Sequence, residues 1–234
     1  PAQLSAPQPQ RNCSRTQHAA MLHALALAAL SWRPPPPTRG AEGLSVAYFA
    51  FGANMARSVL TDRRGVVPLD AAPGRVKGHT LAFNLPGIPL VEPAFASIER
   101  AEPDAECHGV LYTLTPEDWL KVCATEGVFS PFGMGGYRVV SLPVALYDER
   151  TVPAFTLQAG GARVPSAMSL PPSERYLNLL KEGARENGLS LEWQRYLARI
   201  KPSPFSVVQP PERPRADDPR RQRAYERRSG ATFV

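Results

Sequence analysis

The spacing of hydrophobic residues changes once along this chain of 234 residues, and the change constrains the fold more than any other feature. From residue 44 to 159, apolar residues form short runs or alternate with polar ones, as in β-strands. From 172 to 200 they follow one helical stripe. A series of strands followed by helices is typical of the α+β class. We therefore expect a small mixed or antiparallel β-barrel with an inserted helix and two C-terminal helices.

Local signals delimit the individual elements. The inserted helix is predicted after Thr115, which can cap it, with Pro116 at the first helical position and Gly127 as its stop. Pro86, Pro89 and Pro93 are expected to break the chain into an irregular loop. The expected strands lie at residues 44–52, 74–85, 107–114, 136–147 and 152–158, and the two C-terminal helices at 172–188 and 190–200.

Proline limits the extent of the folded part. Many of the 26 prolines lie near the two ends, in PPPP at residues 34–37 and in PPERPRADDP at residues 210–219. Such segments are linkers or tails rather than packed elements. The expected organisation is a docking or targeting-like extension with a Pro-rich linker at 1–43, a domain at 44–201 and a Pro/Arg-rich tail at 202–234.

The net charge of +6 resides in the two ends of the chain. Residues 1–43 contribute +3 and residues 205–234 another +3, so the part between them is neutral. A basic tail without a basic, aromatic-interleaved face is typical of a solvated tail, and nucleic-acid binding is not expected. Three cysteines and four histidines show no metal-ligand spacing, so neither a metal site nor a disulfide framework is expected. Cys107 is interpreted as a core residue, because its neighbour His108 points to the opposite face of the strand.

The N-terminal segment has the composition of an organellar transit peptide. Residues 1–40 contain no acidic residue, carry four arginines and include an apolar helical stretch. That stretch is too short to span a bilayer, so no transmembrane segment is expected. We expect a mitochondrial or chloroplast protein, with a cytoplasmic location as the alternative. A secretory signal starting at Met21 and an ordered extension that docks on the domain or on a partner are the other interpretations.

Three features stand apart from ordinary core and surface. In the turn FGANM, residues 51–55, glycine lets the backbone approach a ligand, and the N–H groups can bind a carboxylate or an oxyanion. Glu126 ends the predicted helix, where the negative end of the helix dipole opposes its ionisation and favours a general base. The glycine-rich loop at residues 129–137 leads to Tyr137 and either covers a pocket or joins two strands. Alone, a glycine turn is more often just a turn, and a glutamate at a helix end is usually solvated surface.

In combination these residues resemble the γ-glutamylcyclotransferase family. Its members begin with a strand and turn of the pattern YFAYGSN, carry the catalytic glutamate in a DEQEGV-like helix end, continue through a G-x-Y segment and close with two helices. The corresponding segments here are YFAFGAN (48–54), CATEGV (123–128), GGY (135–137) and PSERYLNLLKEGARENGLSLEWQRYLARI (172–200). The last match is long and has no gaps, and is therefore the most specific.

The resemblance implies a reaction that needs neither cofactor nor metal. In this family the α-amine of a γ-glutamyl compound attacks its own γ-carbonyl, which releases 5-oxoproline and an amino acid or amine. Glu126 is implied as the general acid/base, and backbone N–H groups of the turn as donors to the γ-carbonyl oxygen or the α-carboxylate. The implied substrate-binding residues are Tyr48, Phe49, Ala50, Phe51, Gly52, Ala53, Asn54, Tyr137 and Phe155.

The chain departs from the family pattern at three hydroxyl groups. Phe51 and Ala53 stand where the family has tyrosine and serine, and Phe155 aligns with a further family tyrosine. Each lost hydroxyl costs about 1–3 kcal/mol if it binds the charged end of the substrate. Two functions follow as hypotheses: an organellar cyclotransferase acting on small γ-glutamyl substrates, or a catalytically inactive relative. The latter would serve as an accessory subunit of an organellar complex that contacts protein partners through residues 1–43 and 202–234.

Overall fold

A computed structural model describes residues 38–40, 43–129, 136–160, 164 and 170–204. The N-terminal targeting-like segment, the C-terminal tail from 205 and residues 130–135 of the glycine-rich loop lie outside the described residues. The chain divides into two units after residue 38, and every element from β2 onward belongs to the second. The elements are β1 (Thr38–Gly40), β2 (Gly43–Ala50), the 3₁₀ helix η1 (Ala53–Met55), α2 (Arg57–Leu60), β3 (Asp70–Lys77), β4 (His79–Ile88), β5 (Glu92–Arg100), β6 (Glu106–Leu114), α3 (Pro116–Thr125), β7 (Tyr137–Leu146), β8 (Thr151–Ala159), α4 (Glu174–Glu186) and α5 (Leu191–Arg199).

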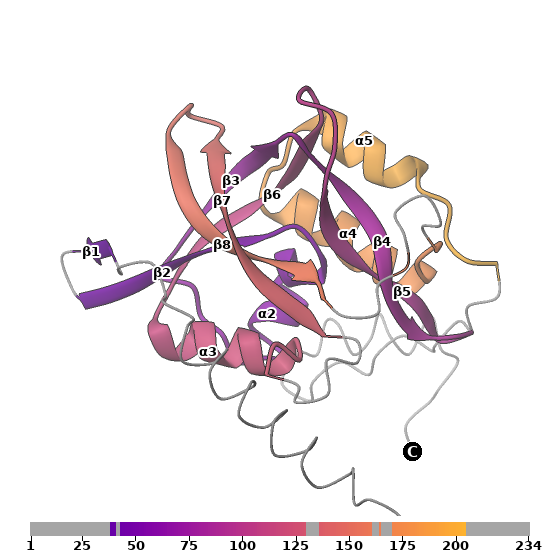
Figure 1. Cartoon of the computed structure of the whole chain (residues 1–234), viewed down its shortest axis with the longest axis horizontal. Coiled ribbons are helices and arrows are strands. Elements are labelled where there is room, and N and C mark those ends of the chain that lie inside the picture. The colour runs from indigo at the N-terminus through magenta and orange to yellow at the C-terminus, as the bar shows by residue number, and fades with distance from the viewer. Residues whose placement is uncertain (1–37, 41–42, 130–135, 161–163, 165–169, 205–234) are drawn as a thin grey trace, which may run out of the picture. The chain divides into compact units, whose positions relative to one another are not determined.

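Five strands close into a mixed β-barrel, in the order β2, β6, β3, β7 and β8, with β8 returning to β2 (Figure 1). Four of the five strand pairs are antiparallel, whereas β2 and β8 are parallel at the pair Tyr48 and Phe155. Beside this pair the hydroxyl of Thr156 donates to the carbonyl oxygen of Phe49 at 2.7 Å and links the two strands. The predicted α+β barrel with an inserted helix and two C-terminal helices is confirmed.

A second, two-stranded sheet corrects two of the sequence predictions. The single strand expected at 74–85 is two strands, because Gly78 adopts a φ of 66° and turns the chain out of the barrel. The irregular loop expected around the prolines is instead the hairpin of β4 and β5, with Pro86 and Pro93 inside the strands. Each strand of a two-stranded sheet has one free edge, which tolerates the missing N–H of proline.

The predicted helix ends agree with the structure. The side chain of Thr115 accepts a hydrogen bond from the N–H of Asp118 at 3.1 Å, and Pro116 is the first residue of α3. Ser173 and Ser190 cap α4 and α5 in the same way. Trp119, on the buried side of α3, stacks on Phe155 of the barrel with ring centroids 5.5 Å apart. Helix α3 is therefore fixed on the barrel wall close to the parallel strand pair.

Helix α4 packs directly on the turn that follows β2. A Cβ atom added at Gly183 would lie 2.6 Å from backbone atoms of Met55 and Ala56, so only glycine permits this approach. Asn187, at the end of the helix, donates from its side chain to the carbonyl oxygen of Met55 at 2.8 Å. The long C-terminal match of the sequence thus holds the FGANM turn in place.

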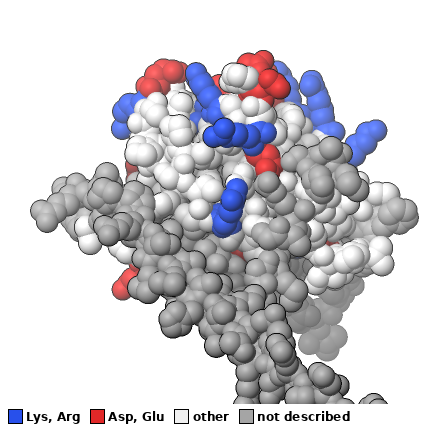
Figure 2. Space-filling view, in the orientation of Figure 1, with Lys and Arg blue, Asp and Glu red and all other residues white. Residues whose placement is uncertain are grey.

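The surface of the barrel carries mixed charge. Figure 2 shows basic and acidic side chains interspersed on the described part of one face, in keeping with the neutral composition of this region. Cys107 is fully buried, as expected for a core residue. Among the described residues, the helices are too short or too polar to cross a membrane.

Candidate active site

A pocket of about 150 Å³ lies where β2 runs into η1. Its lining combines segments that are far apart in sequence: Tyr48, the turn from Phe51 to Asn54, Glu126, Tyr137 and Tyr176. The structure therefore brings together the predicted general base and the glycine turn. Phe51 and Ala53, which lack the family's hydroxyl groups, both line the pocket.

Helix α3 places Glu126 at the pocket. Glu126 is the residue that follows the helix, and its N–H donates to the carbonyl oxygen of Val122 at 3.0 Å. Its own carbonyl oxygen accepts from the N–H of Tyr137 at 3.4 Å, which connects the end of the helix to the start of β7. Val122 and Cys123 are buried one turn earlier, so the end of the helix is anchored in the core. The direction of the Glu126 side chain follows from this anchoring.

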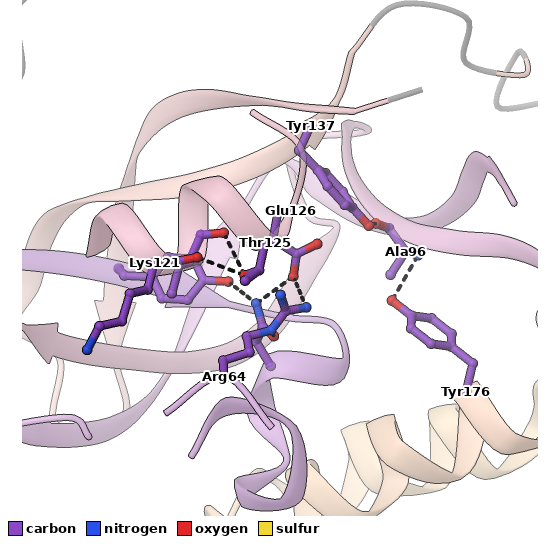
Figure 3. A network of polar contacts seen from close by, with 10 residues as sticks. Arg64, Ala96, Lys121, Thr125, Glu126, Tyr137 and Tyr176 are labelled. Carbon is purple, nitrogen blue, oxygen red and sulfur yellow. Dashed lines mark hydrogen bonds and ion pairs between the residues drawn. The ribbon is translucent and has the colours of Figure 1, made fainter. Parts of the chain in front are cut away.

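Two side chains hold one carboxylate oxygen of Glu126 (Figure 3). The amide nitrogen of Asn54 donates to Oε1 at 2.9 Å, and Nη2 of Arg64 donates to the same oxygen at 2.6 Å. Arg64 also donates through Nε to Oδ1 of Asn54 at 2.9 Å. The amide nitrogen of Asn54 in turn donates to the hydroxyl of Tyr48 at 2.9 Å. The side chains of Arg64 and Glu126 are only 18% and 16% exposed, so this ion pair is largely shielded from water.

Burial raises the pKa of Glu126 above the usual value, although the Arg64 guanidinium and the Asn54 amide act in the opposite direction. The main cause is therefore desolvation and not the helix dipole from which the sequence analysis argued. Burial also raises the pKa of Tyr48, Tyr137 and Tyr176, so these phenols stay neutral. Glu126 is thus a shielded carboxylate with a raised proton affinity among neutral hydroxyl groups.

Two tyrosines meet on the backbone of Ala96, opposite Glu126 (Figure 3). The hydroxyl of Tyr137 donates to the carbonyl oxygen of Ala96 at 2.6 Å. The hydroxyl of Tyr176 accepts from the N–H of Ala96 at 3.1 Å. Together with Tyr48, they supply three hydroxyl groups to the pocket from β2, β7 and α4.

Three residues predicted for the substrate site lie elsewhere. Phe49 is fully buried in the core, where its ring lies 6.5 Å from that of Phe51. Ala50 is buried next to it in β2, and Phe155 stacks on Trp119; none of the three lines the pocket. For Phe49 and Ala50 the prediction took a continuous run, although alternate residues of a strand point to opposite faces. Phe155 packs between the barrel and α3, where its ring stacks on that of Trp119.

Arg64, Ala96 and Tyr176 were not predicted from the sequence. Tyr176 belongs to the long C-terminal match, so the family pattern contained a signal that was not used. Ala96 contributes only its backbone, which no side-chain pattern reveals. Arg64 follows α2 in a turn with a second arginine, and no local feature distinguishes it.

Neither a reactive thiol nor a metal cluster accompanies Glu126 among the described residues. Burial raises the pKa of the Cys123 thiol to about 12, which keeps it protonated near neutral pH. Across the described residues, no three His, Cys, Asp or Glu side chains gather in a way that could hold a metal ion. Glu126 is therefore the candidate for acid–base chemistry in this pocket.

Known proteins with similar sequences carry one common name. The chain is 36% identical over 150 residues to the γ-glutamyl cyclotransferase gliK of Claviceps purpurea, which covers 62% of this chain and 65% of that protein. It is 30% identical over 150 residues to the γ-glutamyl cyclotransferase verK of Clonostachys rogersoniana, over 56% of this chain and 80% of that protein. Identity to the γ-glutamylcyclotransferase of Bos taurus is 27% over 172 residues, or 71% of this chain and 85% of that one. No protein-family model matches the chain.

The match covers only part of the length of the first fungal relatives. It spans between 55% and 65% of the length of gliK from Claviceps purpurea, gliK from Aspergillus fumigatus and aclK from Aspergillus oryzae.

Solved structures agree in fold. One titled γ-glutamyl cyclotransferase superposes with a TM-score of 0.60 at 25% identity, covering 70% of this chain and 92% of that chain. An uncharacterised human protein superposes with a TM-score of 0.59 at 27% identity over the same shares. On sequence and fold together, this chain belongs to the γ-glutamylcyclotransferase family.

Proposed function

We propose that the chain is an active γ-glutamylcyclotransferase that releases 5-oxoproline from small γ-glutamyl amino acids or amines. One observation carries the proposal: Oε1 of Glu126 is held by Asn54 and Arg64, while no described residue bonds to Oε2. Figure 3 shows this second oxygen pointing toward the side of the pocket where Tyr137 and Tyr176 meet Ala96. A carboxylate held in this way is arranged to exchange a proton with a ligand in the pocket.

In the proposed reaction the substrate supplies both reacting groups. Glu126 takes a proton from the α-ammonium group, and the freed amine attacks the γ-carbonyl carbon of the same molecule. The new C–N bond closes the ring, and the attacking nitrogen loses a second proton so that it keeps one N–H in the lactam. The γ-amide C–N bond breaks, and Glu126 passes the two protons in turn to the leaving nitrogen, which departs as an ammonium group. The pocket has to hold a folded substrate conformer, so proximity is the largest contribution, and acid–base help adds about 10²- to 10⁴-fold.

The turn after β2 is the proposed binding site for the γ-carbonyl oxygen or the α-carboxylate. Its own hydrogen bonds use the N–H groups of Met55 and Ala56, which donate to Gly52 and Ala53. The N–H groups nearer the start of the turn are not used by these bonds, although that of Ala53 is bonded to the hydroxyl of Tyr176. Backbone donors at such a position can stabilise negative charge on a carbonyl oxygen as the amine attacks. The hydroxyl of Tyr48, which accepts from Asn54 and keeps its own proton to donate, supports the same role, since the turn itself lacks the family's hydroxyls.

The product and the fate of solvent oxygen test this function. Incubation with γ-glutamyl-alanine and other γ-glutamyl substrates in H₂¹⁸O should yield 5-oxoproline and free amino acid in equal amounts, without ¹⁸O in either. Glutamate labelled with ¹⁸O would indicate hydrolysis by water instead and would contradict the proposal. Absence of any product from all substrates would favour the accessory-subunit hypothesis, for which deletion of residues 205–234 should release the protein from its complex.

A further inference from the structure

Arg64 is the one strong cation at hydrogen-bond distance from Glu126 among the described residues. The guanidinium uses two nitrogens on the same edge: Nη2 donates to Glu126 and Nε donates to Asn54. The N–H groups of this edge are parallel and fixed by the planar group. Arg64 therefore connects the Glu126 carboxylate and the Asn54 amide into a closed ring of hydrogen bonds. We call the pair of residues that hold the carboxylate, Asn54 and Arg64, the Glu126 clamp.

The clamp leaves Asn54 a single orientation. Its oxygen must face Nε of Arg64, because two N–H donors would repel each other there. Its two N–H groups are then directed at Glu126 and at the hydroxyl of Tyr48. Every donor and acceptor of the amide is matched, so the amide can hold the carboxylate in one position. A second donor from Arg64 on the same oxygen leaves Oε2 as the oxygen available to a ligand.

Arg64 is held in place by its own backbone. Its N–H donates to the carbonyl oxygen of Val59 at 3.2 Å, and the next residues close the turn with hydrogen bonds from Gly65 to Thr61 and from Val66 to Leu60. Val66 is fully buried, which anchors the turn in the core. The fold thus fixes the backbone of Arg64, and the hydrogen bonds to Asn54 and Glu126 hold its guanidinium.

We propose that Arg64 is a positioning residue: with Asn54 it fixes Oε1 of Glu126 so that Oε2 faces the substrate as the general base, an inference that rests on the function proposed above. Arg64 also stabilises the ionised carboxylate, since its guanidinium lowers the pKa of Glu126 against the effect of burial. The titratable side chains that line the pocket with Glu126 are arginines and tyrosines: Tyr48, Arg63, Arg64, Tyr137, Arg175 and Tyr176. Among them, Arg175 pairs with Glu92 at 3.0 Å and serves another element.

Substitutions of Arg64 separate charge from geometry. Arg64→Met should shift the acid limb of the pH profile of 5-oxoproline release to higher pH by about 1–3 units, because the neighbouring cation is lost. It should also lower kcat by about 10- to 100-fold through loss of alignment, with KM less affected. Arg64→Lys keeps the cation but lacks the planar fork, so it should keep the acid limb near that of the wild type and still lower kcat.

The matched control is Arg57→Met, which removes an exposed arginine from α2 and should leave kcat and the acid limb unchanged. Thermal unfolding of each variant checks the fold. If Arg64→Met does not fold, the kcat of Arg64→Lys tests the proposal instead. Full kcat in Arg64→Lys, or a wild-type acid limb in a folded Arg64→Met, would overturn the proposal.

A second readout does not need activity. Titration of the Glu126 carboxyl carbon by NMR, assigned with Glu126→Gln, should show a higher pKa in Arg64→Met than in the wild type. An equal pKa in both proteins contradicts the clamp. A wild type that makes no 5-oxoproline contradicts the proposed function instead, so the two failures are distinguishable.

Discussion

Glu126 is subject to two opposing influences within a few ångströms. Burial raises its pKa, while Arg64 and Asn54 stabilise the ionised form through short hydrogen bonds. A solvent-exposed glutamate is a weak base because it loses its proton so readily. Partial burial makes Glu126 a stronger proton acceptor, and its two partners prevent it from being neutralised and misaligned.

The pH dependence of the reaction should report this environment. A general base works in its deprotonated form, so kcat/KM should rise with pH as Glu126 loses its proton. Because burial raises the pKa of Glu126, the midpoint of this acid limb should lie above about 4.3, the value of a free glutamate. A pH–rate profile of 5-oxoproline release measures it. A midpoint at or below 4.3 would show that Glu126 is not the titrating base.

Single residues differ in how far the sequence reveals them. Glu126 was predicted because the helix dipole opposes the ionisation of a carboxylate at this helix end, and because the residue lies in a segment resembling a known family. Arg64 was not, because its contact with Glu126 joins residues 62 positions apart and depends on the barrel. Phe155 was assigned to the pocket by alignment, but its ring stacks on Trp119. Tertiary contacts determine where the side chains of Arg64 and Phe155 lie.

At the scale of elements, local chemistry was a good guide wherever one residue determines a boundary. Helix α3 begins and ends near its predicted limits, because the Thr115 cap and Pro116 act on their own helix. The hairpin of β4 and β5 was missed, because prolines usually mark loops and its pairing depends on a partner strand. Gly78 was not recognised as a break, since a glycine inside an alternating pattern also fits a continuous strand.

The contact between α4 and the FGANM turn should tolerate no side chain at Gly183. Gly183→Ala would place a methyl group 2.6 Å from backbone atoms of Met55 and Ala56, which cannot move aside as a flexible side chain would. We expect a loss of about 1–3 kcal/mol in the free energy of unfolding. Urea titration of both proteins measures it. An unchanged stability would show that α4 can move away from the turn.

Helix α5 docks through a histidine that should make stability depend on pH. The His108 ring stacks on that of Trp193 with centroids 5.0 Å apart. Its Nδ1 is hydrogen-bonded to the hydroxyl of Tyr147 at 2.6 Å, and its Nε2 lies 3.3 Å from a carboxylate oxygen of Glu106. Burial lowers the pKa of His108, although Glu106 opposes the shift. Below about pH 6.5 the unfolded chain binds a proton that the folded protein does not, so stability should fall there.

The variant His108→Gln isolates this contribution. As the pH is lowered from 7.5 toward the pKa of His108 in the folded protein, the free energy of unfolding should fall in both proteins. The fall should be larger in the wild type than in the variant. Urea titrations at a series of pH values give the two curves. Parallel curves would show that His108 does not contribute to the pH dependence.

On the scale of the whole molecule, the net positive charge lies in the two ends of the chain and not in the barrel domain. The barrel and its helices are close to neutral, with both signs on the described face in Figure 2. The basic excess lies in residues 1–43 and 205–234. We propose that the basic ends serve in targeting or in partner binding.

An import assay tests the role of the first segment. A fluorescent protein fused to residues 1–43 should accumulate in mitochondria or chloroplasts, because the segment is basic, apolar and free of acidic residues up to residue 40. The control replaces the four arginines of the segment, Arg11, Arg15, Arg33 and Arg39, by glutamine and should stay in the cytosol. Cytosolic fluorescence from both fusions would contradict the targeting proposal.

The most direct test of the central claim compares 5-oxoproline release by the wild type and by Glu126→Gln under identical conditions. Glutamine keeps the size of the side chain but cannot accept the proton. The wild type should form 5-oxoproline from at least one γ-glutamyl substrate, and the variant should be slower by about 10²- to 10⁴-fold. Equal rates in the two proteins would show that Glu126 is not the catalytic base.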